Sequence, residues 1–92
     1  MFKPNHSYAL RDPERYDDEF GEGYGRAIAG PSTMEGAWLT DCWIANDQGK
    51  VHPGYSACPV PIRFEDVVEE SAKAFVGDLP RPASLMDSSF FR

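Results

Sequence analysis

The chain has no long apolar run, and this absence limits where it can act. None of its apolar stretches approaches the roughly 20 residues that a membrane-spanning helix needs. The segment from Met1 to His6 also lacks the hydrophobic region of a secretory signal peptide. We therefore expect a protein without a membrane partner that stays in the cytoplasm where it is made.

Residues that carry chemistry are also scarce. The chain has two histidines, His6 and His52, and two cysteines, Cys42 and Cys58, and they form no closely spaced pair of the kind that holds zinc. Cytoplasmic thiols are usually reduced, so we expect both cysteines to be buried free thiols. The alternative is a thiolate activated by His52 or a zinc site built from all four residues, which reactivity or metal analysis would reveal. We predict no catalytic residues, no metal and no cofactor.

Positive charge is in short supply as well. Nine Lys and Arg stand against fifteen Asp and Glu, which gives a formal net charge of −6. Binding to nucleic acid needs clusters of basic residues that neutralise phosphates, and the chain lacks them. The glycine-rich segment 21–25 contains Glu22 and lacks the lysine of a phosphate-binding loop. We therefore expect no direct nucleic acid partner, and a field that steers the chain towards basic protein surfaces.

The composition is nevertheless sufficient for one small folded domain, because 41% of the 92 residues are hydrophobic and 13% are aromatic. Alternating polar and apolar residues predict strands at 7–10 and 37–45, with shorter extended segments at 26–29, 50–52 and 58–62. The segment Asn46–Gly49 has the composition of a hairpin turn. In the strand at 37–45, the more apolar face should point to the core; it consists of Trp38, Thr40, Cys42 and Ile44.

Two helices complete the prediction. The first should begin at Asp12, with Pro13 in its first turn, and end at Phe20 before Gly21. The second should run from Phe64 to about residue 76, because apolar residues recur there at helical spacing. The expected fold is α+β: a small antiparallel sheet of three to four strands, open or barrel-like, with two short helices. Residues 1–78 should form the domain, and the tail 79–92 should pack back on it, with a docking arm as the alternative.

Acidic side chains gather at the two predicted helices. Six carboxylates lie between Asp12 and Glu22, and four lie between Glu65 and Glu70. Solvated helix faces can have this composition, but the charge density favours a surface that binds a partner. Aromatic residues commonly anchor such surfaces, although Trp43 could instead pack beneath the tail. The predicted partner-binding residues are Asp17, Asp18, Glu19, Glu22, Glu65, Asp66, Glu69 and Glu70, together with Trp43 and Tyr24.

Two segments resemble small proteins encoded by T7-like phages. Residues 2–14, FKPNHSYALRDPE, are similar to an opening strand of the form F-K-x-G-x-x-Y-x-L that continues into an acidic helix. Residues 43–51, WIANDQGKV, are similar to the central hairpin of those proteins. The chain departs from the pattern at Asn5, where a turn glycine is usual.

The resemblance implies a phage-encoded inhibitor that acts in the bacterial cytoplasm, such as an anti-restriction, anti-CRISPR or polymerase-binding protein. Some proteins of this kind mimic DNA. The carboxylate-rich surface would then occupy a basic or nucleic-acid-binding surface of a host protein, and the chain would not be an enzyme. The alternative is a non-enzymatic adaptor or assembly module that docks through Phe90 and Phe91 in the tail.

Overall fold

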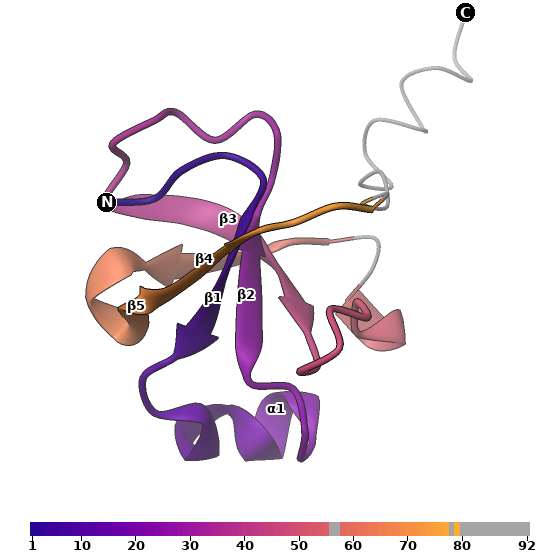
Figure 1. The fold of residues 1–92 in the computed structure, drawn as a ribbon. Coiled ribbons are helices and arrows are strands. Elements are labelled where there is room, and N and C mark those ends of the chain that lie inside the picture. The colour runs from indigo at the N-terminus through magenta and orange to yellow at the C-terminus, as the bar shows by residue number, and fades with distance from the viewer. Residues whose placement is uncertain (56–57, 78, 80–92) are drawn as a thin grey trace, which may run out of the picture.

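A computed structural model describes residues 1–55, 58–77 and 79, and these form one antiparallel sheet of five strands with short helical turns (Figure 1). The strands are β1 (His6–Leu10), β2 (Arg26–Ala29), β3 (Leu39–Ala45), β4 (Val60–Arg63) and β5 (Val67–Ala74). A single short α-helix, α1 (Asp17–Phe20), accompanies three 3-10 turns, η1 (Pro13–Tyr16), η2 (Pro53–Tyr55) and η3 (Phe64–Asp66). The predicted α+β class is therefore confirmed.

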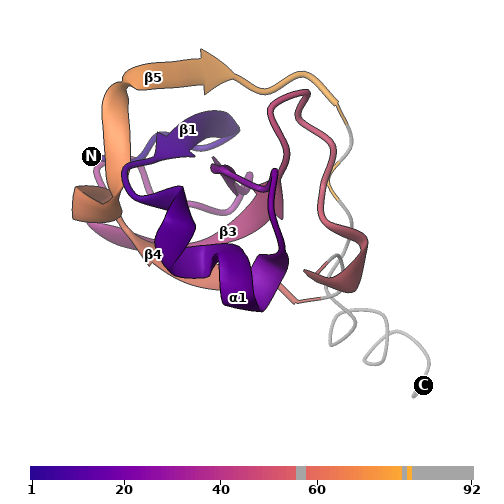
Figure 2. The same ribbon diagram turned by 90° about the horizontal axis from the view of Figure 1, so that it is seen from below.

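The order of strands is β4-β3-β2-β1-β5. The first four strands follow one another as a meander, and β5 returns to pair with the free edge of β1. The sheet curls, and α1 lies at one end of it (Figure 2). Among the described residues β4 and β5 do not pair, so the sheet has five strands rather than three to four and is not closed into a barrel.

Both faces of the sheet carry a core. The inner face holds the larger one, which includes Tyr8, Leu10 and Ile44 and contacts Phe2 from the N-terminal segment. Phe2 and Tyr8 meet edge to face with ring centroids 5.4 Å apart, a geometry that aromatic pairs favour. The outer face holds a smaller core, in which Ile28, Trp43 and Ala45 are packed with Val51, Phe75 and Leu79.

Strand β3 is buried on both faces in its second half and exposed in its first half. The prediction that Cys42 and Ile44 face the core is confirmed, since both are fully buried. The same prediction is wrong for Trp38, whose side chain is 69% exposed. Trp38 precedes the strand and lies beyond the part of the sheet that the core covers, which residue alternation alone does not indicate.

The predicted helix from Phe64 to residue 76 is wrong. Only η3 forms there, and Val67–Ala74 is β5. A helix would leave the outer edge of β1 without backbone partners, although that strand is largely buried. Tertiary pairing overrides the local helical pattern in such a case, and the adjacent valines at 67 and 68 favour a strand.

A bulge in β5 explains how a helix-like apolar spacing fits a strand. Ser7 pairs with Lys73 and Ala9 with Val68, so two residues along β1 correspond to five along β5. The odd number of extra residues switches the face to which the following side chains point. Val67 consequently lies in the inner core, whereas Phe75 packs in the outer one.

The helical segment at 12–20 is present as η1 followed by α1, so this prediction is confirmed in outline. Tyr16 and Phe20 stack on one side with ring centroids 5.6 Å apart, and Gly21 ends the helix with a φ of 85°. Asp12 precedes the first turn, but its side chain makes no capping hydrogen bond.

The remaining connections agree in part with the predictions. Asn46 accepts hydrogen bonds from the backbone of Gln48 and Lys50 in the hairpin turn, and Gly49 has a φ of 83°. The return segment 50–52 is reduced to one isolated bridge between Ala45 and Val51. The extended segment at 58–62 becomes the edge strand β4, as predicted. The tail from residue 80, including Phe90 and Phe91, lies outside the described residues.

Candidate functional site: an acidic pocket and its surroundings

Four carboxylates, each from a different segment, line one pocket of about 250 Å³. Glu14 comes from η1, Asp17 from α1, Glu22 from the following loop, and Asp47 from the hairpin after β3. Tyr24 supplies an aromatic side, and among the described residues no basic one lines the pocket. We call this the acidic pocket.

Local backbone geometry brings these side chains together. Gly21 and Gly23 both have φ values near 90°, at 85° and 91°, so the chain turns sharply between α1 and β2. The backbone of Leu10 then bonds to the carbonyl of Gly25 at 2.8 Å, which fixes the end of this loop against β1. The glycine-rich segment 21–25 is therefore a turn, and it places Glu22 and Tyr24 at the pocket.

His52 joins the acidic helix to the segment that follows the hairpin. Its Nε2 lies 2.8 Å from the carbonyl oxygen of Phe20, and its Nδ1 accepts a hydrogen bond from the Gly54 amide at 2.9 Å. These partners require a neutral ring with the hydrogen on Nε2. Its ring also contacts Tyr24, with centroids 4.2 Å apart. Both ring nitrogens are engaged in the fold, which leaves neither of them directed at a thiol.

The second acidic group begins next to the first. Arg15 of η1 forms an ion pair with Asp66 of η3 at 3.6 Å, and the Arg11 amide donates to the Asp66 carbonyl at 2.8 Å. Burial, followed by the nearby Asp66 carboxylate, raises the pKa of Tyr16. Asp18, Glu19 and Glu65 are exposed, so the surface from α1 across η1 to η3 is predominantly negative.

Glu69 and Glu70 do not belong to the acidic pocket. They lie in the bulged part of β5, where both side chains are exposed. Their predicted position on a helix with Glu65 and Asp66 is wrong because β5 turns away from η3 to follow β1. Of the eight predicted carboxylates, only Asp17 and Glu22 line the pocket itself.

The aromatic anchor expected at Trp43 is not on the surface. Trp43 is 5% exposed and is packed in the outer core. Trp38 is instead the exposed tryptophan, and with Leu39, Arg63, Phe64 and Glu65 it lines a second pocket of about 330 Å³. Glu65 of η3 connects this aromatic pocket to the acidic surface. Tyr24 is half-buried at the acidic pocket.

Sequence reasoning did not select Glu14, Asp47 or Trp38. Glu14 belongs to the group of six carboxylates between Asp12 and Glu22. The sequence therefore indicated its charge, but it did not indicate that its side chain lines a pocket. Asp47 lies in a turn whose contact with η1 depends on the whole sheet. No local signal indicated that Trp38 would be exposed.

The thiols give no sign of an activated nucleophile. Cys42 is fully buried, and burial raises its pKa to about 12, with the Asp41 carboxylate as a second cause. Its Sγ lies 3.7 Å from the Thr40 carbonyl, to which it can donate. Both cysteines are free, as predicted, but the predicted burial is wrong for Cys58, which is exposed. Within residues 1–55, 58–77 and 79, no three His, Cys, Asp or Glu side chains have the geometry of a metal site.

Comparisons with protein-family models, curated proteins and solved structures found no match to this chain. No helix in the described part of the chain combines the length and apolar character needed to cross a membrane. The functional assignment must therefore be argued from the geometry of the surface.

Proposed function

We propose that this chain acts by binding a protein with a basic surface, and that the acidic pocket receives an arginine or lysine side chain of that partner. The observation that carries the proposal is the convergence of four carboxylates and a tyrosine on one pocket, which no basic residue lines in the part of the chain that the structure describes. These carboxylates are too dispersed to form a metal site among the described residues, but a guanidinium group is planar, broad and able to bond several of them.

The surroundings of the pocket extend the contact surface. The negative surface continues from α1 to η3, where the Arg15–Asp66 pair joins its two parts. Next to it, Trp38 and Leu39 are exposed beside Phe64. An exposed tryptophan near a charged area is a common arrangement in protein interfaces, where the aromatic residue provides affinity and the charges guide association.

The resemblance to small phage proteins makes the proposal more specific. A carboxylate-rich surface that covers a basic, nucleic-acid-binding surface would inhibit a host enzyme or a defence complex without chemistry. The proposal includes that this chain is not itself an enzyme. The adaptor alternative depends on Phe90 and Phe91, which lie outside the described residues.

The experiment has two stages. The chain is first used to capture proteins from a bacterial lysate at low and high salt, and the captured partner is then purified for affinity measurements. We expect capture to weaken at high salt, because ion pairs across an exposed interface are screened. The double variant Asp17→Asn/Glu22→Gln should weaken binding about tenfold or more, since it removes two charges from the pocket.

The matched control is Glu35→Gln/Asp41→Asn. It removes the same charge from exposed positions at the other end of β3, outside the lining of the acidic pocket. This control should bind within about twofold of the original chain, a difference of less than about 0.5 kcal/mol. Equal losses in both double variants would show that only net charge matters, and salt-independent capture would remove the electrostatic basis of the proposal.

A further inference from the structure

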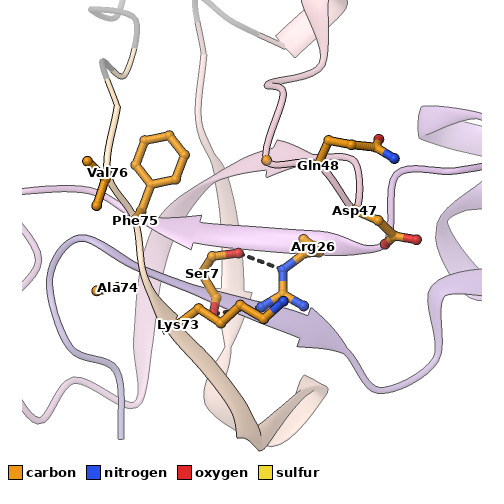
Figure 3. A pocket seen from close by; sticks show the side chains of 9 residues that line it. Ser7, Arg26, Asp47, Gln48, Lys73, Ala74, Phe75 and Val76 are labelled. Atoms are coloured by element: carbon orange, nitrogen blue, oxygen red, sulfur yellow. Dashed lines mark hydrogen bonds between the residues drawn. The ribbon is translucent and has the colours of Figure 1, made fainter.

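A third pocket, of about 270 Å³, lies on the outer face of the sheet and has the opposite character (Figure 3). Arg26 of β2 and Lys73 of β5 both line it, together with Ser7 of β1. The hairpin residues 47–49 and the end of β5 form its other sides. A pocket with two basic side chains is unexpected on a chain whose net charge is −6.

Arg26 is the central residue of this pocket, and it is only 9% exposed. Its Nε donates to the Ser7 hydroxyl at 2.7 Å, and its Nη2 donates to the carbonyls of Ser7 and Ser71, each at 2.9 Å. These bonds hold the guanidinium in one orientation across β1 and the bulge of β5. They use three of the five N–H donors, and among the described residues the two donors on Nη1 have no partner.

Arg26 forms no ion pair in the described part of the chain, although Asp47 lines the same pocket. Its three hydrogen-bond acceptors are neutral, and no carboxylate among the described residues lies within ion-pair distance of Arg26 or Lys73. A buried cation is costly unless an anion accompanies it. Lys73, whose side chain is exposed, adds a second positive charge to the same pocket.

The lining of the pocket also indicates the form of the anion. Nη1 of Arg26 and the ammonium of Lys73 provide separate donors, which suits the two oxygens of a carboxylate. Ser7 accepts from Arg26, so its own hydrogen is available as a further donor. The opposite side consists of Ala74, Phe75 and Val76, and Figure 3 shows the Phe75 ring on that side. The volume greatly exceeds the space for one water molecule.

We propose that this pocket binds the carboxylate of a small organic acid, with Arg26, Lys73 and Ser7 holding the carboxylate and Phe75 contacting the hydrocarbon part. Asp47 lines both this pocket and the acidic pocket. This residue of the hairpin turn is therefore shared by a proposed site for an anion and a proposed site for a cation. Because the two sites take ligands of opposite charge, this proposal does not depend on the proposed protein partner.

Titration of the isotope-labelled full chain by NMR tests the proposal, with the Nε resonance of Arg26 and the backbone of β5 as reporters. The probes are benzoate, hexanoate and inorganic phosphate. The two carboxylates should shift these signals in a saturable manner, and phosphate should bind more weakly because it offers no hydrocarbon to Phe75. Phosphate binding as tight as benzoate, or no saturable shift with either carboxylate, would overturn the assignment.

Variants locate the site. Lys73→Gln should weaken benzoate binding about tenfold, because one charge-assisted hydrogen bond is lost. The control Arg63→Gln removes the same charge on β4, at the opposite edge of the sheet, and should leave affinity unchanged. Asp47→Asn should strengthen binding, since it removes the nearest negative charge in the lining. Because Arg26 also supports the bulge, substituting it would affect the fold as well as binding. The variant Lys73→Gln is therefore the one that tests the site. Equal weakening by Lys73→Gln and Arg63→Gln would refute the site.

Discussion

The buried thiol of Cys42 predicts a specific loss of stability at alkaline pH. The pKa of this thiol is raised from 9.0 to about 12, chiefly by burial. Above pH 9 the unfolded chain therefore loses this proton while the folded chain keeps it. The folded state then binds more protons than the unfolded state, so the free energy of unfolding falls as pH rises through the interval from 9 to about 12.

The magnitude follows from linkage. Each pH unit in that interval removes about 1.4 kcal/mol, so the contribution of Cys42 should decrease by about 2 kcal/mol between pH 9 and about pH 10.5. The hydrogen bond from Cys42 Sγ to the Thr40 carbonyl is also lost when the thiol is deprotonated, because a thiolate cannot donate.

The assay is urea unfolding, followed by tryptophan fluorescence at several pH values. Both proteins carry Cys58→Ser so that Cys42 is the only thiol, and the reference protein also carries Cys42→Ala. Other titrating groups are shared, so the difference between the two free energies of unfolding isolates Cys42. Above pH 9, the free energy of unfolding of the protein with Cys42 should fall relative to that of the alanine variant. Parallel pH profiles would refute the account, as would rapid labelling of Cys42 by a maleimide in the folded protein.

Three further predictions concern the fold, and all can be read from urea unfolding at neutral pH. Ser71→Ala should cost about 1–3 kcal/mol, because Ser71 Oγ accepts the Ala9 amide where the bulge interrupts backbone pairing; an unchanged midpoint would mean that the bulge rearranges. Phe2→Ala should cost about 3–5 kcal/mol, since Phe2 is fully buried against Tyr8 and Phe64; a small loss would show that the N-terminal segment contributes little to the core. Asn5 has a φ of 60°, so Asn5→Gly should be nearly neutral and Asn5→Val should cost about 1–2 kcal/mol; equal stabilities would contradict the left-handed conformation.

Turn chemistry and the alternation of polar and apolar residues predicted much of the fold correctly. The strands at 7–10, 26–29 and 37–45, the turn at 46–49 and the helical segment at 12–20 all form. Each depends on residues that are neighbours in the sequence, such as Gly21 after Phe20. Asn5 lies in the left-handed region, which asparagine adopts more readily than most residues other than glycine.

The errors arose where distant segments decide the structure. The segment from Phe64 to residue 76 has helical spacing, yet the open edge of β1 requires a strand there. Trp43 is buried because Phe75 and Leu79 pack on the outer face of the sheet, whereas Trp38 lies beyond the core and is exposed. A pattern along one strand shows which residues share a face, but it does not show how far the core extends on either side.

The candidate sites divide in the same way. The sequence alone determined that the chain is acidic, that its carboxylates are clustered and that its basic residues are sparse, because charge is a property of composition. Only the tertiary structure decided which charges meet. It brings Asp47 into the same pocket as Glu14 and Asp17. It also places Lys73 in the same pocket as Arg26, because the bulge changes which face of the sheet the following side chains of β5 point to. Register and loop closure control these contacts, and both depend on residues far apart in the chain.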